Sequence, residues 1–446
     1  GLERRGRRRL QVQGCNEIIL IMVPKVLNGY KTKDTERLRI EKKFLPLMEE
    51  DLKLGSLVSY VGNRSIPLLR LYRYKEAFAF EFVRYFIKKF GLTSEDYVFD
   101  PFSGMGTTLF SSMLQQIPSV GVDRLPVAVF VAETLPKFLS IKKGELTQTF
   151  KELRSNLAHG EPCHVATDVP IVKLAFDEET LLRLRLWKTA IETLPSATKD
   201  VFLLLFFSAI EATSYTSNDG QFLRIKKDKR RIHPDEALFK KVADAEEDLE
   251  RIPWLFPSWK VAENYLPSVF LGDTRELKKI SFKSSPTAII TSPPYANRYD
   301  YTRSYCLELC FHFVKDFKEL RSIRNNILRS HIESKINADE GASHPALEEA
   351  VEALMCKDLN NPRIPHMLIG YFNDMAKVIK EWKRVLARGA KIAMVVDNVR
   401  FEGELIPVDL ILSELAQRTG FEIQKIIVCR YKGNSSQQMK TYGRVP

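Results

Sequence analysis

A glycine-containing turn between a predicted strand and a predicted helix is the first feature with chemical potential. Residues 96–100 form a short apolar strand, Gly104 and Gly106 follow in the turn, and residues 109–114 continue as a helix. Asp123 ends the next predicted strand, 23 residues after Asp100, where a carboxylate can accept hydrogen bonds from both hydroxyls of a ribose. The turn therefore indicates a ribose-containing ligand. Because it lacks the full G-x-G-x-x-G pattern, a dinucleotide is less favoured, and a purely structural turn is the alternative.

A second constellation follows the predicted strand at 288–291. Ser292, Pro293, Pro294 and Tyr295 come directly after it. Two consecutive prolines cannot donate backbone hydrogen bonds, so the chain leaves the sheet there with carbonyl groups free to point into a site. The Ser292 hydroxyl and the Pro293 carbonyl can accept hydrogen bonds from an exocyclic amine, and Tyr295 offers a ring for stacking. The alternative is an ordinary proline terminator of a strand.

Taken together, segments 100–108 (DPFSGMGTT) and 291–295 (TSPPY) resemble the S-adenosylmethionine-dependent amino-methyltransferases of DNA. The Ser-Pro-Pro-Tyr form is most similar to the cytosine-N4 branch of that family. Segment 74–86, the pair Gly272 and Asp273, and segment 371–398 add support, and the resemblance covers roughly residues 66–140 and 269–446. It implies a target-base site formed by Ser292, Pro293, Pro294 and Tyr295. It also implies a cofactor site formed by Phe78, Asp100, Pro101, Gly104, Gly106, Thr107, Asp123 and Asp273, with Asp123 on the ribose and Asp273 near the adenine amine.

The resemblance implies direct transfer of a methyl group from S-adenosylmethionine to the N4 amine of a cytosine flipped out of double-stranded DNA. Many family members carry Asp at the position of Ser292, a stronger acceptor that is associated with adenine N6, so an adenine-N6 enzyme is one alternative. An RNA amino-methyltransferase and a catalytically silent DNA-binding subunit are the others. Direct methyl transfer needs no metal, and the seven histidines are not spaced as ligands, so we expect no metal site.

Basic residues point to a polyanionic partner. The chain has 68 Lys and Arg against 56 Asp and Glu, a formal net charge of +12. Segment 215–231 mixes amide side chains with a basic cluster suited to phosphates. From it we predict DNA contacts by Tyr215, Arg224, Lys226, Lys227 and Arg230, and Arg298 beyond the diproline is a further candidate. A solvated run of charges is the alternative interpretation.

Strand and helix patterns predict an α/β fold, namely a Rossmann-like methyltransferase domain with a mostly parallel sheet and a helical insertion. The expected organisation is a basic arm and extension at 1–65 and a cofactor-binding half at 66–140. A helical insertion for target recognition follows at 141–268, and a catalytic half at 269–446 includes a helical excursion at about 305–370. Within the insertion, apolar periodicity predicts helices at 178–193, 199–213 and 234–251.

The remaining features concern location. The longest apolar runs, 18–24 and 201–207, are much shorter than the roughly 18 residues of a membrane span. The Arg-rich first nine residues lack a signal-cleavage pattern, and the six cysteines are scattered, as in reduced cytosolic proteins. We therefore expect a cytoplasmic, nucleoid-associated protein without membrane contact. The oligomeric state, and whether a further strand belongs after 421–430, stay open.

Overall fold

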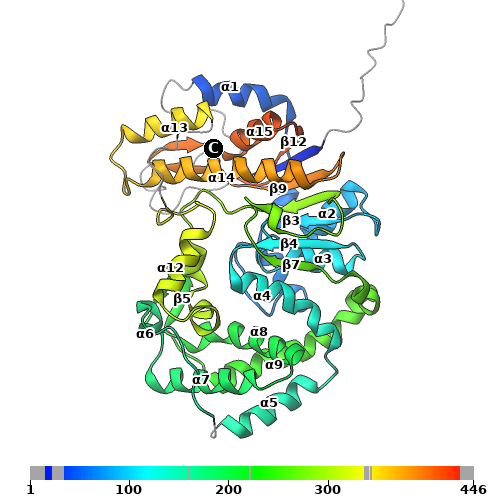
Figure 1. Cartoon of the computed structure of the whole chain (residues 1–446), viewed down its shortest axis with the longest axis vertical. Coiled ribbons are helices and arrows are strands. Elements are labelled where there is room, and N and C mark those ends of the chain that lie inside the picture. Colours follow the sequence, from blue (N-terminus) through cyan, green and yellow to red (C-terminus); the bar gives the residue numbers. More distant parts are fainter. Residues whose placement is uncertain are drawn as a thin grey trace, which may run out of the picture.

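The core of the protein is an eight-stranded sheet in which every pairing is parallel (Figure 1). The computed structural model describes residues 16–22, 35–157, 160–219, 222–335, 341 and 344–431. In spatial order the strands are β2 (Met48–Glu50), β12 (Glu422–Val428), β1 (Glu17–Met22), β9 (Lys391–Val395), β8 (Ala288–Thr291), β3 (Val98–Asp100), β4 (Ser119–Asp123) and β7 (Ser268–Leu271). The predicted Rossmann-like α/β fold is confirmed.

Helices cover both faces of this sheet, because alternate strand residues point to opposite sides. In β9, Ile392 and Met394 belong to a core shared with α1 (Thr35–Phe44), α13 (Pro345–Met355), α14 (Ile364–Val385) and α15 (Val408–Arg418). Ala393 and Val395 pack on the other face, against α2 (Phe80–Phe90). The strands are thus apolar on both sides, as a buried parallel sheet requires.

The chain reverses its winding direction between β3 and β8, which are neighbours in the sheet. From β3 it proceeds through α3 (Thr107–Leu114) to β4 and then to β7 on one side, whereas from β8 it proceeds to β9 and β12 on the other. Ligands of open parallel sheets bind at the carboxyl ends of strands at such a switch point. The turn at 101–106 and the diproline segment leave the sheet at these two strand ends.

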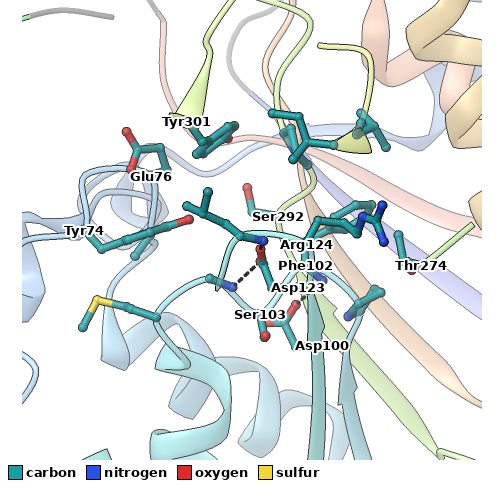
Figure 2. Close-up of a pocket in the computed structure, with 18 of the residues that line it drawn as sticks. Tyr74, Glu76, Asp100, Phe102, Ser103, Asp123, Arg124, Thr274, Ser292 and Tyr301 are labelled. Carbon is teal, nitrogen blue, oxygen red and sulfur yellow. Dashed lines mark hydrogen bonds between the residues drawn. The ribbon is translucent and has the colours of Figure 1, made fainter. Parts of the chain in front are cut away.

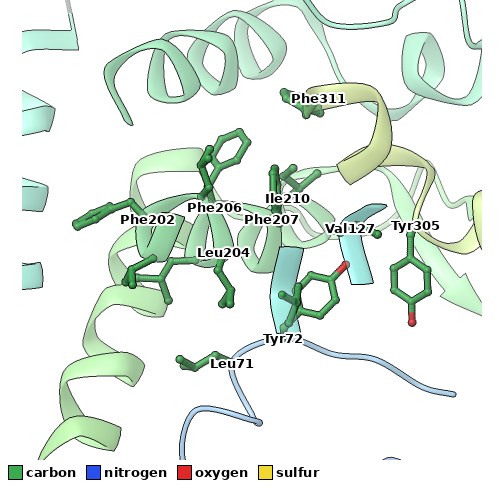
Figure 3. Packing of buried hydrophobic residues seen from close by; sticks show 14 of the residues in the cluster. Leu71, Tyr72, Val127, Phe202, Leu204, Phe206, Phe207, Ile210, Tyr305 and Phe311 are labelled. Atoms are coloured by element: carbon green, nitrogen blue, oxygen red, sulfur yellow. The ribbon is translucent and has the colours of Figure 1, made fainter. Parts of the chain in front are cut away.

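The predicted insertion is mainly helical and packs on the sheet domain. It contains α5 (Glu145–Asn156), α6 (Pro170–Ala175), α7 (Glu178–Glu192), α8 (Ser196–Thr213) and α9 (Pro234–Leu255), so the three predicted helices are confirmed. Phe202, Phe206 and Phe207 of α8 belong to the same hydrophobic cluster as Tyr72 and Val127 of the sheet domain, part of which is drawn in Figure 3. A hairpin of β5 (Thr216–Asp219) and β6 (Phe222–Ile225), which the sequence analysis missed, lies between α8 and α9.

The expectation that residues 1–65 form only an arm and an extension is corrected. β1 lies inside the sheet between β12 and β9, and β2 forms its edge. The apolar run of β1 has its pairing partners about 370 to 400 residues away, at Lys391–Val395 and Glu422–Val428, so local patterns did not reveal its role. Residues 1–15, including the Arg-rich start, lie outside the described residues.

The remaining elements are short or peripheral to the site. The predicted excursion at about 305–370 contains α11 (Cys306–Glu308), the π-helix η8 (Leu309–Phe313), α12 (Phe317–Asn326) and α13, and α10 (Tyr301–Ser304) precedes it. The others are α4 (Pro126–Thr134), β10 (Val399–Phe401), β11 (Glu404–Ile406), η1 (Leu45–Leu47), η2 (Leu52–Ser56), η3 (Tyr60–Ser65), η4 (Leu135–Ser140), η6 (Pro257–Tyr265) and η7 (Leu277–Lys279). None of the helices in the described part of the chain has both the length and the apolar character of a membrane span.

Candidate functional site

The turn after β3 depends on two glycines with left-handed backbone conformations. Gly104 has φ +49 and Gly106 has φ +86, a region that side chains with a Cβ rarely occupy. A Cβ on Gly104 would come within 3.0 Å of the Tyr74 ring, so the backbone passes close to that side chain. The Gly104 amide donates a hydrogen bond to Asp123 Oδ2 at 2.8 Å, which ties the turn to the end of β4. This hydrogen bond fixes the position of the turn at the carboxyl edge of the sheet.

This turn borders a cavity, which we call the turn cavity (Figure 2). Seven of the eight predicted cofactor residues line it, namely Phe78, Asp100, Pro101, Gly104, Thr107, Asp123 and Asp273. Tyr74, Glu76, Ser103, Arg275, Ser292, Pro294 and Tyr301 also line it. Gly106 is the exception, because it does not line the cavity, and its contact with the cofactor stays a prediction. It faces Ala132 of α4, where a Cβ would come within 2.8 Å, so its role in the structure is close helix packing.

Polar groups in the turn cavity are available to a ligand. The hydroxyls of Ser103 and Thr107 are buried and have no hydrogen-bond partner among the described residues. Asp123 accepts from the backbone amides of Leu125 and Gly104, at 2.9 and 2.8 Å, and burial raises its pKa although these bonds oppose the shift. A buried hydroxyl without a hydrogen-bond partner lowers the stability of the folded protein, and a bound ligand can supply the missing partner. The cavity therefore fits a ligand with several hydroxyl and amine groups.

Asp100 links the helix after the glycine turn to the end of β8 through hydrogen bonds. One of its carboxylate oxygens accepts from the Thr108 hydroxyl and the other from the Thr291 hydroxyl, both at 2.6 Å. The Thr108 hydroxyl also contacts the carbonyl of Ile290 at 3.2 Å. Burial raises the pKa of Asp100 to about 6, although these hydrogen bonds oppose the shift. Asp100 lines the cavity, but both of its oxygens have internal partners, so its evident role is to position the two bends.

A second cavity, which we call the diproline cavity, lies at the end of β8. Ser292, Pro293 and Tyr295 line it together with Lys75, Glu76, Asn297, Tyr299, Tyr301, Asp397 and Arg430. The Ser292 hydroxyl lies 3.3 Å from the Tyr295 hydroxyl, to which it donates a hydrogen bond. Burial raises the pKa of Tyr295, so its hydroxyl stays protonated at neutral pH. The cavity combines aromatic rings with hydroxyl, amide and carboxylate acceptors, which suits a planar ring carrying an amine.

The two cavities share three lining residues, Glu76, Ser292 and Tyr301. In Figure 2, Ser292 lies between Asp123 on one side and Tyr301 and Glu76 on the other. The glycine turn and the diproline segment, about 190 residues apart in the sequence, thus face one continuous site. Glu76 and Tyr301 were missed from the sequence, because a single Glu and a single Tyr in a varied segment carry no recognisable spacing.

Asp273, predicted to lie near the adenine amine, is paired with an arginine. Its two oxygens accept hydrogen bonds from Arg275 Nε and Nη2, at 2.9 and 2.8 Å. Burial by itself would raise the pKa of Asp273, but the bonds from Arg275 outweigh it and hold that pKa below the ordinary value. Arg275 also binds Asp374 at 2.7 Å. Asp273 therefore borders the turn cavity as one half of an ion pair, and Arg275 is a further lining residue that the sequence analysis missed.

The predicted basic cluster lies on the β5–β6 hairpin and the loop that follows it. Arg224, Lys226, Lys227 and Arg230 are exposed. The hairpin is anchored near the diproline cavity, because Lys75, which lines that cavity, donates to the side-chain oxygen of Asn218 at 3.1 Å.

Tyr215 and Arg298 are less accessible, because each packs against other side chains. The Arg231 guanidinium covers the Tyr215 ring at 4.0 Å, so Tyr215 is packed as part of the fold. Arg298 is half-buried, donates to Asn360 Oδ1 at 3.1 Å and lies over the Phe401 ring. Neither side chain is as accessible as the exposed cluster.

One group of side chains among the described residues has the types and spacing of metal ligands: Asp300, His331 and Glu333. Asp300 lies about 30 residues before the other two, and the group was not predicted. Arg324 lies 2.7 Å from Asp300 Oδ2, and Arg303 lies 2.5 Å from Glu333 Oε1. These arginines neutralise the two carboxylates, which disfavours a bound cation. The expectation of no metal stays a prediction.

Comparison with known proteins gives several relatives. The type II methyltransferase M.BsoBI of Geobacillus stearothermophilus is 33% identical, with 92% of this chain and 90% of that protein covered. M.AvaI of Nostoc sp. is 32% identical, with 91% and 90% covered. M.MvaI of Kocuria varians is 22% identical, with 72% and 74% covered. All three are named type II methyltransferases.

Other comparisons contribute less. No protein-family model matches the chain. The rRNA methyltransferase aviRa of Streptomyces viridochromogenes covers 63% of this chain and 74% of its own, at 12% identity, and its TM-score of 0.24 is too low to support an argument. The identity to M.BsoBI and M.AvaI extends over about nine tenths of the chain. The chain therefore belongs to the type II DNA methyltransferases, whose methyl donor is S-adenosylmethionine.

Proposed function

We propose that this methyltransferase transfers a methyl group to the exocyclic N4 amine of a cytosine flipped out of double-stranded DNA. The observation that carries the proposal is that Ser292 lines both cavities, so a ligand in each would meet at this residue. Direct transfer requires the acceptor nitrogen and the methyl group to lie close together and in line. Adjacent cavities with a common wall support that arrangement.

In this proposal the turn cavity holds S-adenosylmethionine, which supplies a methyl group on a positively charged sulfur. Asp123 would accept hydrogen bonds from the ribose, and the unpartnered hydroxyls of Ser103 and Thr107 would bind its polar groups. Phe78 would pack against an apolar part of the cofactor. Asp273, paired with Arg275, would lie near the adenine.

The diproline cavity would hold the target base. Ser292 Oγ and the Pro293 carbonyl would accept the amine hydrogens, which draws the nitrogen lone pair out of conjugation with the ring, and Tyr295 would stack on the base. A base inside a duplex cannot reach such a cavity, so it must flip out at a cost of a few kcal/mol. A serine hydroxyl at this position favours cytosine, whereas a carboxylate would favour adenine.

Target recognition is proposed for the insertion at 141–268, and in particular for its basic hairpin. The link from Lys75 to Asn218 holds this hairpin beside the diproline cavity. Exposed cations at this place would neutralise phosphates that flank the flipped nucleotide. Arg298, already bound to Asn360, is proposed only as a peripheral contact.

Removing two hairpin charges tests this role. We expect the double substitution Lys227→Ala and Arg230→Ala to weaken duplex binding and to reduce the slope of log K against log salt concentration by about 1.8, because each phosphate contact contributes about 0.9. Fluorescence anisotropy over a salt series measures both quantities. As a control, Lys88→Ala and Lys89→Ala remove two exposed cations from the last turn of α2, near the amino edge of the sheet, and should leave the slope unchanged. Equal slopes in all three proteins would contradict the assignment.

Nucleoside analysis tests the proposed product. Duplex DNA with random sequence, treated with the protein and S-adenosylmethionine and then digested, should yield N4-methylcytosine by mass spectrometry. N6-methyladenine instead would replace the cytosine assignment by the adenine alternative. Labelled methyl groups in tRNA and none in DNA would favour an RNA enzyme. Cofactor binding without any methylated product would favour a silent DNA-binding subunit.

A further inference from the structure

We propose that Glu76 accepts the proton that the target amine loses during methyl transfer. The inference rests on the proposed function, since it concerns the same pair of cavities. It assigns a role to a carboxylate outside the two motifs on which the family resemblance is based.

Glu76 has the position that such a role requires. Of the carboxylates in the described part of the chain that line the turn cavity or the diproline cavity, Glu76 is the only one that lines both. Its Oε1 is buried and has no hydrogen-bond partner among the described residues, whereas Oε2 accepts from the Tyr305 hydroxyl. One oxygen is thus held in place while the other is available.

The other carboxylates of the two cavities are less suited. Both oxygens of Asp100 and both oxygens of Asp123 accept internal hydrogen bonds, and Asp273 is paired with Arg275. Asp397 lines only the diproline cavity and does not border the space proposed for the methyl donor. By this comparison Glu76 is the best placed base.

The chemistry calls for such a group. As the bond from nitrogen to the methyl carbon forms, the bond from that carbon to sulfur breaks, and its electron pair stays on the sulfur. The nitrogen must then lose one proton for the product to be neutral. A serine hydroxyl and a proline carbonyl can accept a hydrogen bond, but neither can hold this proton at neutral pH. The Glu76 carboxylate can take it and becomes a neutral acid.

The surroundings of Glu76 shift the pKa of its carboxyl group upward, which suits a general base. Burial raises the pKa of Glu76, although the hydroxyls of Tyr299 and Tyr305 and the charge of Lys75 oppose the shift. The other titratable groups that face it are the hydroxyls of Tyr72, Tyr74 and Tyr301. A base whose pKa lies closer to neutrality takes up a proton more readily than an ordinary carboxylate does.

The decisive comparison is Glu76→Gln against Glu308→Gln in the full chain. Glu308 is a matched control, because it is half-buried like Glu76, accepts a hydrogen bond at 3.3 Å from Tyr72, one of the tyrosines that face Glu76, and lines neither cavity. We expect Glu76→Gln to lower the single-turnover rate of methyl transfer about 100-fold, within the range of general base catalysis. Glu308→Gln should stay within about threefold of the wild type, since a neutral amide can still accept from Tyr72.

Three further measurements separate proton transfer from a structural role. Calorimetry should give S-adenosylmethionine affinity within about twofold of the wild type for Glu76→Gln, and anisotropy should give equal duplex affinity. The wild-type rate should fall as pH drops through the pKa of Glu76, because only the carboxylate accepts a proton, and this fall should be absent in Glu76→Gln. Infrared titration of the protein without ligands should show one carboxyl, titrating above the ordinary range, that Glu76→Gln lacks.

These measurements distinguish a failure of the Glu76 role from a failure of the proposed function. A Glu76→Gln protein that transfers methyl groups at the wild-type rate, or one that keeps the wild-type fall in rate at low pH, would overturn the inference. If the wild-type protein yields methyladenine, the cytosine assignment fails, while the comparison of the two glutamine variants still tests Glu76. If the wild type methylates no nucleic acid, the proposed function itself fails, and the infrared titration alone then decides whether Glu76 is a high-pKa carboxyl.

Discussion

Replacing Asp123 with alanine is expected to lower the affinity for S-adenosylmethionine about a thousandfold. The carboxylate accepts hydrogen bonds from the backbone amides of Gly104 and Leu125, at 2.8 and 2.9 Å. Its loss therefore removes the bond that fixes the turn beside the cavity. It also removes the proposed acceptor of the ribose hydroxyls. Hydrogen bonds to a charged group contribute about 1.5 to 3 kcal/mol each, and the loss of two corresponds to about 4 kcal/mol. Isothermal titration calorimetry measures the effect.

Asp96→Ala is the matched control for this prediction. Asp96 also accepts a hydrogen bond from a backbone amide, in this case that of Thr93. It lies just before the amino end of β3, away from the cavity. Its substitution should leave cofactor affinity unchanged, and circular dichroism should show that both variants are folded. An Asp123→Ala protein that binds S-adenosylmethionine as tightly as Asp96→Ala does would refute the placement of the cofactor in the turn cavity.

Replacing Tyr295 with alanine is expected to abolish most methyl transfer while leaving cofactor binding intact. Tyr295 lines the diproline cavity and not the turn cavity. Loss of stacking removes about 1 to 3 kcal/mol of base binding. Displacement of the base by about 1 Å can cost a further factor of about 100. We therefore expect a fall on the order of 1000-fold in the single-turnover rate, with the dissociation constant of S-adenosylmethionine changed less than twofold.

Tyr295→Phe separates the ring from its hydroxyl. Phenylalanine keeps the stacking surface and loses only the hydrogen bond from Ser292, so this variant should retain activity within about tenfold of the wild type. If the alanine variant transfers methyl groups normally, Tyr295 does not hold the base. If Tyr295→Ala also loses affinity for S-adenosylmethionine, the diproline cavity and the turn cavity do not bind base and cofactor independently, as the proposal requires.

Much of the fold was predictable because its signals are local. The helices at Glu178–Glu192, Ser196–Thr213 and Pro234–Leu255 each carry an apolar face with the helical period, and they occur within a few residues of their predicted bounds. The strands that precede the turn and the diproline segment were also found. The β5–β6 hairpin was missed because each strand has only four residues and β5 consists of polar residues typical of a solvated loop. β1 was missed because its pairing partners lie near the other end of the chain.

Parts of the site were not predictable for a different reason. Glu76, Arg275 and Tyr301 belong to no motif with a fixed spacing, and only the packing of distant segments brings them into the cavities. Gly106 is predicted to contact the cofactor from its place in the motif, and only the structure shows that Ala132 also packs closely against it. Asp273 is predicted to lie near the adenine amine, and only the structure shows that Arg275 binds both of its carboxylate oxygens. Such pairings depend on three-dimensional neighbours.

The amino-acid sequence by itself determined which groups are available for chemistry: a glycine turn with a following carboxylate, and a serine and a tyrosine around two prolines. These signals are local, because they follow from backbone sterics and side-chain type over a few residues. Only the tertiary structure decided that β3 and β8 are neighbours, that Asp100 links their ends through Thr108 and Thr291, and that Glu76 lies where the two cavities meet. Strand order in a sheet is set by contacts between residues far apart in the chain, which no local pattern encodes.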